Sequence, residues 1–203
     1  MTEKSKAGES ARERIMKAAM HAFMEQGYAG TSTLEIATRA KVSKRDIYTE
    51  FGNKQNLLAA CIGGRAQRMR PAGEIPPIRS KEDLAAALIL FGATQLREIT
   101  HPDVVGVFRL AIAEAGRAPE VAQTLDGAGR DAVRTTLREL MQKALAAGLV
   151  EGPVPDMSGE FAALLFRGLM VDLLLGIAST PDEAEIDRRV KAAVEAFLKL
   201  RGT

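Results

Sequence analysis

The chain has 203 residues, of which 46% are hydrophobic and 27% are charged, a composition typical of a globular protein rather than of a disordered or membrane-embedded one. Cys61 is the only cysteine, which excludes an internal disulfide and a zinc site built from several thiolates. The net charge of +2 is unevenly divided: residues 1–70 hold 13 Lys and Arg against 7 Asp and Glu, an excess that suggests an anionic partner such as DNA but can also lie on solvated helix faces.

The first residues are polar, and residues 1–14 lack the apolar stretch of a secretory signal. We expect residues 1–9 to be a disordered arm and the protein to be cytoplasmic. The most apolar run, residues 161–178, approaches the length of a membrane helix, but Arg167 and Asp172 interrupt it. This run is interpreted as a buried helix, and no membrane partner is expected.

Three short helices are predicted in the first domain, residues 10–53. The first helix begins at Ser10, which has the spacing of a capping box with Glu13, and ends at Gly27, a favourable left-handed residue after a helix. Its apolar residues share one face: Ile15, Ala19, Ala22 and Phe23.

Two further helices are predicted over residues 32–40 and 43–51, joined by a tight connection at residues 41–43. The positions that must be apolar in a helix-turn-helix are apolar: Ile36, Ala37, Ala40, Val42 and Ile47. In that motif the second helix enters the major groove, about 12 Å wide, while the first lies across the phosphates. The pattern predicts a DNA-binding helix-turn-helix, although a plain three-helix packing unit would bury similar residues.

Polar side chains of this segment suit contact with DNA. Hydroxyls and free backbone N–H groups at the start of the second helix form a natural phosphate site, and Lys44 and Arg45 can pair with guanine O6 and N7. The predicted DNA-contacting residues are Thr31, Ser32, Thr33, Ser43, Lys44, Arg45, Tyr48, Thr49 and Lys54.

From Arg12 to Ile62 the sequence resembles the DNA-binding domain of TetR-type regulators. The matching residues are Gly27-Tyr28, Thr31-Ser32-Thr33, Ile36-Ala37, Val42-Ser43-Lys44, Ile47-Tyr48, Phe51, Lys54 and Leu57-Leu58. The resemblance implies phosphate contacts by Thr33, Tyr48 and Lys54. It also implies base reading by Lys44, Arg45 and Thr49.

Three positions depart from the family's pattern. Lys41 stands where Gly is common and is expected to be left-handed at a cost of roughly 1 kcal/mol. Arg45 replaces a frequent Gly and can add a guanine contact. Glu50 replaces a frequent His, and either accepts from a cytosine amine or points away. The operator sequence therefore does not carry over.

The rest of the chain is also predicted to be helical, which makes the protein all-α with about nine helices. Residues 54–70 form a connecting helix, residues 71–79 form a linker with three prolines and a glycine, and residues 80–203 form a larger C-terminal domain. The helices expected there span residues 81–100, 103–115, 119–148, 157–178 and 182–200.

By resemblance, the C-terminal domain forms a homodimer and binds an effector. The last two helices carry more apolar side chains than one buried face needs, so two such pairs can form a four-helix interface, unless they pack only into their own core. The predicted interface residues are Leu165, Leu169, Leu173, Val190, Val194 and Phe197. Such a dimer would set two recognition helices one DNA turn apart, about 34 Å, and predicts an inverted-repeat operator in double-stranded DNA.

A small hydrophobic effector is expected, although its candidate contacts are equally explained as ordinary core or surface ion pairs. These candidates are Phe91, Phe108, Arg109, Met141, Phe166 and Met170, with Arg167 as a further polar anchor. Gly63-Gly64 inside a helix is either a flexible point that transmits an effector-driven shift or a plain helix break.

No catalytic, metal-binding or cofactor-binding constellation is apparent. His21 and His101 have no neighbours at metal-ligand spacing, and residues 127–129 lack the preceding strand of a dinucleotide site. The predicted function is that of a transcriptional regulator, by resemblance a repressor, which a small molecule releases from its operator. The alternative is a small-molecule-binding or catalytic helical bundle whose N-terminal helices mediate protein contacts.

Overall fold

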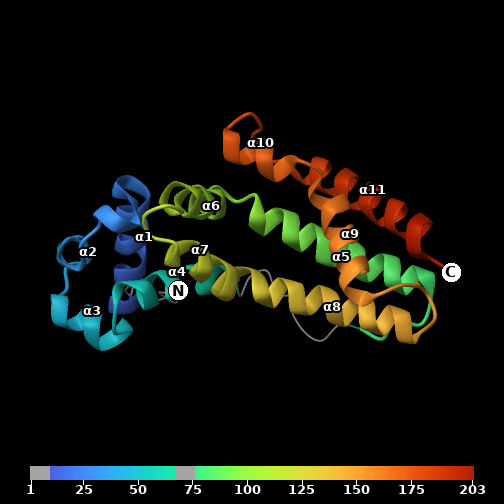
Figure 1. The fold of residues 1–203 in the computed structure, drawn as a ribbon, viewed down its shortest axis with the longest axis horizontal. Helices are drawn as coiled ribbons and strands as arrows, with labels where there is room; N and C mark the ends of the chain where they lie inside the picture. The colour runs from blue at the N-terminus through green and yellow to red at the C-terminus, as the bar shows by residue number, and fades with distance from the viewer. Residues whose placement is uncertain (1–9, 67–75) are drawn as a thin grey trace, which may run out of the picture. The chain divides into compact units, whose positions relative to one another are not determined.

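The computed structural model describes residues 10–66 and 76–203 and divides the chain into two compact units (Figure 1). The first unit combines residues up to Gly64 with Leu110–Ala128, and the second combines Arg65–Arg109 with Gly129–Thr203. Among the described residues every regular element is a helix, and strand-like pairing is limited to one bridge between Val150 and Gly202. The all-α prediction is confirmed. The predicted arm and most of the predicted linker fall outside the described residues.

The first unit contains the predicted helix-turn-helix. Its helices are α1 (Ala11–Gly30), α2 (Thr33–Ala40), α3 (Lys44–Phe51), most of α4 (Lys54–Ala66), the end of α6 (Pro102–Glu114) and the short α7 (Glu120–Leu125). At the starts of α1, α2 and α3, the hydroxyls of Ser10, Ser32 and Ser43 each accept a hydrogen bond from the backbone N–H three residues further on. The predicted helix starts are therefore confirmed.

The inner faces of these helices form one apolar core. The most deeply buried side chains are Ile15, Ala19, Ala22 and Phe23 of α1, Ile36 of α2, Ile47 of α3, and Leu57 and Leu58 of α4. Helix α2 packs against both α1 and α3. Because α2 and α3 are held by their apolar sides, their polar sides face outward.

Gly27 interrupts α1 with a φ of 78° and a ψ of 162°, and one further turn continues to Gly30. The sequence placed the end of the helix at Gly27 itself. The carboxylate of Glu114 lies where a Cβ at this position would be, so a larger residue would both strain the backbone and collide with α6. Gly27 thus allows the end of α6 to contact α1 closely within the first unit.

The turn of the helix-turn-helix depends on Lys41, which ends α2 with φ 55° and ψ 49°. Its backbone N–H and that of Val42 both donate to the carbonyl of Ala37, which closes the last turn of α2. The predicted left-handed conformation is confirmed.

The second unit is a helical bundle with its own apolar core. Its helices are α5 (Lys81–Ile99), the first part of α6, α8 (Asp131–Ala146), α9 (Val154–Phe166), α10 (Leu169–Leu175) and α11 (Glu183–Arg201). Helix α11 packs against α5 and α9, and α8 packs against α9. At the centre, the ring of Phe161 lies 6.4 Å from that of Phe91 and 5.6 Å from that of Phe197.

Two long helices predicted from the sequence are each divided in the structure. The segment 119–148 contains α7, a π-helical turn at Asp126–Arg130 and α8. The turn contains Gly127 and Gly129, and glycine has a low propensity for the α-helix. The segment 157–178 breaks at Arg167 and Gly168, which are both left-handed, with φ of 31° and 82°. These breaks raise the number of α-helices among the described residues from the expected nine to eleven.

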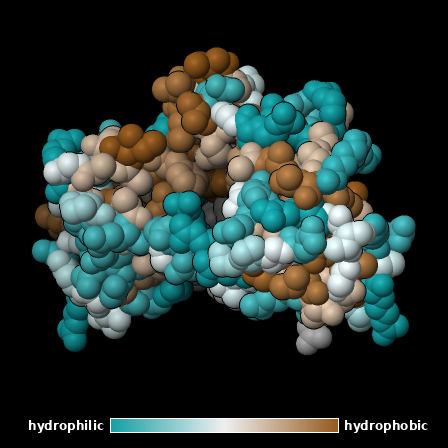
Figure 2. Space-filling model, turned by 45° about the vertical axis from the view of Figure 1, so that its right-hand side comes forward, coloured by the Kyte–Doolittle hydropathy of each residue, from teal (hydrophilic) through white to brown (hydrophobic). Residues whose placement is uncertain are grey.

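No helix in the described ranges combines the length and the apolar character needed to cross a membrane. Apolar side chains nevertheless reach the surface at the end of α10, where Leu175 is 67% and Ile177 is 74% exposed. The hydrophobic patch at the top of Figure 2 lies over this segment.

Replacing Lys41 by Gly is expected to raise the free energy of unfolding by up to about 1 kcal/mol, because glycine adopts the left-handed conformation without a Cβ penalty. Thermal or urea unfolding of the purified protein measures the change. The exposed Lys81→Gly at the start of α5 is the contrast, since a helix start has no need of positive φ; a variant at Lys41 that is less stable than the native chain would contradict the assigned turn.

Candidate nucleic-acid interface

The outward face of α3 gathers five polar side chains on an exposed surface. Ile47 and Phe51 on its inner face are 0% and 7% exposed and hold the helix against the first unit. The side chains that face outward are Ser43, Lys44, Arg45, Tyr48 and Thr49. All five were expected to contact DNA, and the structure brings them together on one helix face.

Tyr48 connects this face with the start of α2. Its hydroxyl lies 3.4 Å from the Thr33 hydroxyl, and the Lys44 ammonium lies 5.7 Å from the centre of its ring. Two hydroxyls at this distance can both donate to one phosphate, while the lysine adds a positive charge nearby. The structure therefore groups Thr33 and Tyr48, two of the three residues that resemblance assigned to phosphate contacts.

Asp46 caps α3 and leaves the other polar residues free to face outward. Its carboxylate accepts a 2.8 Å hydrogen bond from the Ser43 N–H, which lowers the pKa of Asp46 below its usual value. Ser43 completes the capping box by accepting a hydrogen bond from the Asp46 N–H. The hydroxyl of Ser43 is therefore engaged within its own helix.

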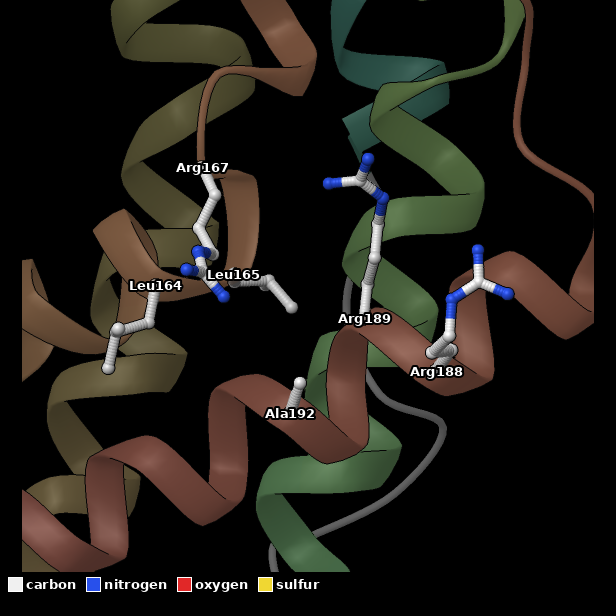
Figure 3. A pocket seen from close by; sticks show the side chains of 6 residues that line it. All are labelled: Leu164, Leu165, Arg167, Arg188, Arg189 and Ala192. Atoms are coloured by element: carbon white, nitrogen blue, oxygen red, sulfur yellow. The ribbon is translucent and has the colours of Figure 1, made fainter.

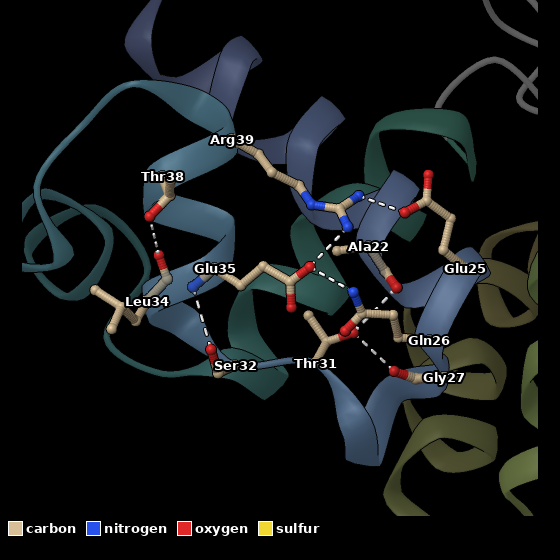
Figure 4. Close-up of polar contacts among 10 residues, drawn as sticks. All are labelled: Ala22, Glu25, Gln26, Gly27, Thr31, Ser32, Leu34, Glu35, Thr38 and Arg39. Atoms are coloured by element: carbon tan, nitrogen blue, oxygen red, sulfur yellow. Dashed lines mark hydrogen bonds and ion pairs between the residues drawn. The ribbon is translucent and has the colours of Figure 1, made fainter.

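Thr31 has a structural role rather than the predicted contact with DNA. It is 2% exposed, and its hydroxyl donates to the carbonyls of Ala22 and Gly27 at 3.0 and 2.8 Å, which ties the end of α1 to the start of α2 (Figure 4). A hydroxyl buried in this way is unavailable to a phosphate. Ser32, by contrast, is exposed as the cap of α2.

Lys54 is also engaged inside the first unit. Its ammonium donates to the carbonyls of Tyr28 and Thr31 at 2.8 and 3.1 Å and lies 4.3 Å from the centre of the Tyr28 ring. The sequence suggested a phosphate contact for Lys54. The structure shows that its charge first serves backbone carbonyls near the end of α1.

Ion pairs, which sequence reasoning did not single out, fix α2 and α3 to α1. Arg39 binds Glu25 and Glu35, each at 2.6 Å (Figure 4). Arg12 pairs with Glu50, so the negative charge of Glu50 on α3 is balanced by an arginine of α1. The spacing of Glu35 and Arg39 was a readable signal for a helical pair, whereas the pairs between helices had none.

The predicted effector contacts do not surround an open site. Phe91 and Met141 are buried in the core of the second unit, and Phe108, Phe166 and Met170 are half-buried. Arg109 donates to the carbonyls of Leu173 and Leu174, at the end of α10. Its guanidinium is therefore used to close that helix.

The predicted dimer contacts are also corrected. All six side chains, namely Leu165, Leu169, Leu173, Val190, Val194 and Phe197, are at most 4% exposed within one chain. They are core residues and offer little surface to a partner. The helical spacing identified an apolar face correctly, but that face packs into the chain's own bundle.

One pocket of the second unit, lined by described residues, lies between the end of α9 and α11 and has a volume of about 260 Å³. Figure 3 shows its lining residues, Leu164, Leu165, Arg167, Arg188, Arg189 and Ala192. Of these, the sequence had suggested only Arg167 as an anchor for an effector.

A helix-turn-helix with a polar, exposed second helix defines a DNA-binding regulator class. The family model described as bacterial regulatory proteins of the TetR family matches residues 15–61, and the one described as the C-terminal domain of AefR-like transcriptional repressors matches residues 86–201. The chain belongs to the TetR family of transcriptional regulators.

Two relatives match part of the chain. It is 36% identical over 88 residues to the HTH-type regulator YvkB of Bacillus subtilis, covering 43% of this chain and 44% of that one. It is 48% identical over 50 residues to the HTH-type regulator HbdR of Aromatoleum, covering 25% and 22%. The matches thus span less than half of the length of these relatives.

Solved structures match almost the whole chain. A TetR regulator from Agrobacterium tumefaciens has a TM-score of 0.78 at 28% identity, covering 96% of each chain. The flavonoid-responsive regulator FrrA has a TM-score of 0.77 at 27% identity, covering 95% of this chain and 97% of that one. The N-terminal motif and the C-terminal bundle therefore both have the architecture of this family.

Replacing Lys44 and Arg45 together by Ala is expected to relax sequence preference, because each base pair read by a bidentate contact contributes about 1–3 kcal/mol of discrimination. Binding to a preferred duplex and to single-base variants of it, measured at one salt concentration, checks this. The double variant Lys191→Ala with Lys199→Ala removes the same charge from α11 and should leave the preference unchanged; an equal effect of both pairs would refute base reading by α3.

Proposed function

We propose that this protein represses transcription by binding an inverted-repeat operator as a homodimer, and that a small-molecule effector bound by the second unit releases it. The observation that carries this proposal is the polar, exposed face of α3, which stands over a fully buried Ile47. A helix supported in this way can enter the major groove without exposing apolar surface. As a regulator of transcription it would act in the cytoplasm.

Repression and effector release are supported by the relatives. The family model for residues 86–201 is that of a repressor domain, and FrrA, 27% identical, is by its name a flavonoid-responsive regulator. We infer a small organic effector for this chain as well. The contacts with DNA proposed for this function are those of Ser32, Thr33, Lys44, Arg45, Tyr48 and Thr49.

The direct test is selection of bound duplexes from a random pool by the purified protein. The expected outcome is a sequence with two inverted half-sites whose centres lie one helical turn apart, about 34 Å, because a twofold dimer presents two copies of α3 in that arrangement. Enrichment of single half-sites would argue against a dimer. Enrichment of no sequence at low salt would refute the function.

The exposed apolar segment of α10 is the surface that we propose for the dimer. Val171, Leu175 and Ile177 are 58%, 67% and 74% exposed, and a second copy of the segment can bury them across a twofold axis (Figure 2). This surface replaces the core residues that the sequence had suggested. Two of those core residues, Leu169 and Leu173, lie on the same helix, so α10 carries apolar residues on more than one side.

Replacing Leu175 and Ile177 together by Glu is expected to give a folded monomer, because like charges would meet in an otherwise apolar contact. Sedimentation velocity measures the oligomeric state, and circular dichroism checks that the helices remain. Leu145→Glu, at a 39% exposed position of α8, should remain dimeric; a dimeric Leu175/Ile177 variant would exclude this surface.

The boundary between the first and second units falls between Gly64 and Arg65, directly after the pair Gly63-Gly64. A Cβ at Gly63 would meet nothing within 4 Å, and one at Gly64 would have only an ordinary contact with Met16. Neither glycine is therefore needed for packing. We propose that the pair lets the first unit move when an effector binds.

Replacing both glycines by Ala is expected to stabilise α4 by about 1–2 kcal/mol and to weaken effector release while operator binding remains. Induction of a reporter gene, compared with unfolding of the purified variant, separates the two effects. Gly159→Ala in α9, where a Cβ also meets open space, should stabilise the protein without changing induction. An unchanged response in the Gly63/Gly64 variant would remove the hinge.

A further inference from the structure

The pocket between α9 and α11 has two chemically different sides. Leu164, Leu165 and Ala192 supply an apolar wall, and three arginines supply the rest (Figure 3). The arginines are Arg167, at the end of α9, and Arg188 and Arg189, on consecutive positions of α11. With a volume of about 260 Å³, the pocket can hold a small organic molecule or its acidic end.

The arginines of the pocket outnumber their carboxylate partners. Glu185 pairs with both Arg188 and Arg189, so one negative charge is shared by two guanidinium groups. Neighbouring carboxylates are engaged elsewhere, since Glu160 binds Arg201 and Glu183 binds Arg97. Among the described residues, the ion pairs at the pocket thus set one carboxylate against three guanidinium groups.

Of the three arginines that line the pocket, Arg167 alone forms no ion pair with a described residue. It ends α9 in a left-handed backbone conformation, with φ 31° and ψ 55°, which residues other than glycine and asparagine rarely adopt. Its backbone N–H donates to the carbonyl of Ala163, and Gly168 follows it directly. The fold thus holds an unpaired guanidinium at the pocket in a backbone conformation that is unfavourable for arginine.

We propose that this pocket binds the carboxylate of a small amphipathic organic acid, with Arg167 as the principal contact and the leucines against the apolar body. A guanidinium donates two parallel hydrogen bonds to a carboxylate, and the partly apolar surroundings strengthen them. This inference rests on the proposed function, for which it names the chemical class of the effector. It also moves the effector contact from the filled core around Phe91 and Met141 to a preformed pocket.

The test is calorimetric titration of the full-length, DNA-free protein with three probes: sodium benzoate, benzyl alcohol and inorganic phosphate. Benzoate should bind saturably with one molecule per chain, and the neutral alcohol at least about 10-fold more weakly, because it lacks the charge that pairs with arginine. Phosphate should also bind more weakly than benzoate, because it has no apolar body.

Arg167→Asn tests the assigned contact, since asparagine tolerates the left-handed conformation but lacks the guanidinium. Benzoate binding should fall at least about 10-fold in this variant. Lys199→Gln, which removes a positive charge from the far end of α11, should leave it unchanged. Equal affinity of Arg167→Asn and the native chain would overturn the proposal.

Further outcomes would also overturn it: no saturable benzoate binding, equal binding of benzyl alcohol, or phosphate binding as tight as that of benzoate, which would indicate a simple anion site. Release of a selected operator by benzoate is measured separately. If the protein binds its operator and benzoate does not bind, this inference fails and the proposed function stands. If no duplex is bound at all, the proposed function itself fails.

Discussion

The burial of Ile47 and Phe51 fixes the orientation of α3, and the rest of the interface depends on it. With this face held against α1 and α2, the polar residues of an eight-residue helix all turn outward. The left-handed Lys41 makes the connection to α2 short enough for this packing. A rotation of α3 about its own axis would expose its apolar face, so the contacts that stabilise the unit also determine which side chains α3 exposes.

The junction of α1 with α2 stabilises this arrangement. Thr31 and Lys54 donate hydrogen bonds to backbone carbonyls between Ala22 and Thr31, and Gly27 admits the carboxylate of Glu114 in the same region. Two residues expected to bind phosphate are therefore needed by the protein itself. The polar residues of this region thus divide into those that form the proposed DNA-binding surface and those that stabilise its support.

Sequence reasoning predicted the first unit well because its signals are local. The capping box at Ser10 and the apolar spacing of α2 and α3 depend on neighbours within four residues. The role of Lys54 was not predictable in this way, because its partners, the carbonyls of Tyr28 and Thr31, lie more than 20 residues earlier in the chain. The role of Thr31 depends on its burial and on the carbonyl of Ala22, nine residues earlier. The break at Arg167 and Gly168 was also missed, since an arginine carries no helix-ending signal and the glycine alone is tolerated within helices.

The central claim, that α3 reads bases in the major groove, is tested most directly by cleavage from a reagent tethered to the helix. Cys61 is buried and its pKa is raised to about 12, so an Arg45→Cys variant can be labelled with iron-EDTA at that single position. On a selected operator the label should cut both strands within each half-site, at nucleotides that face the major groove. Cleavage without preference along the duplex, or none on a duplex that the protein binds, would contradict the account.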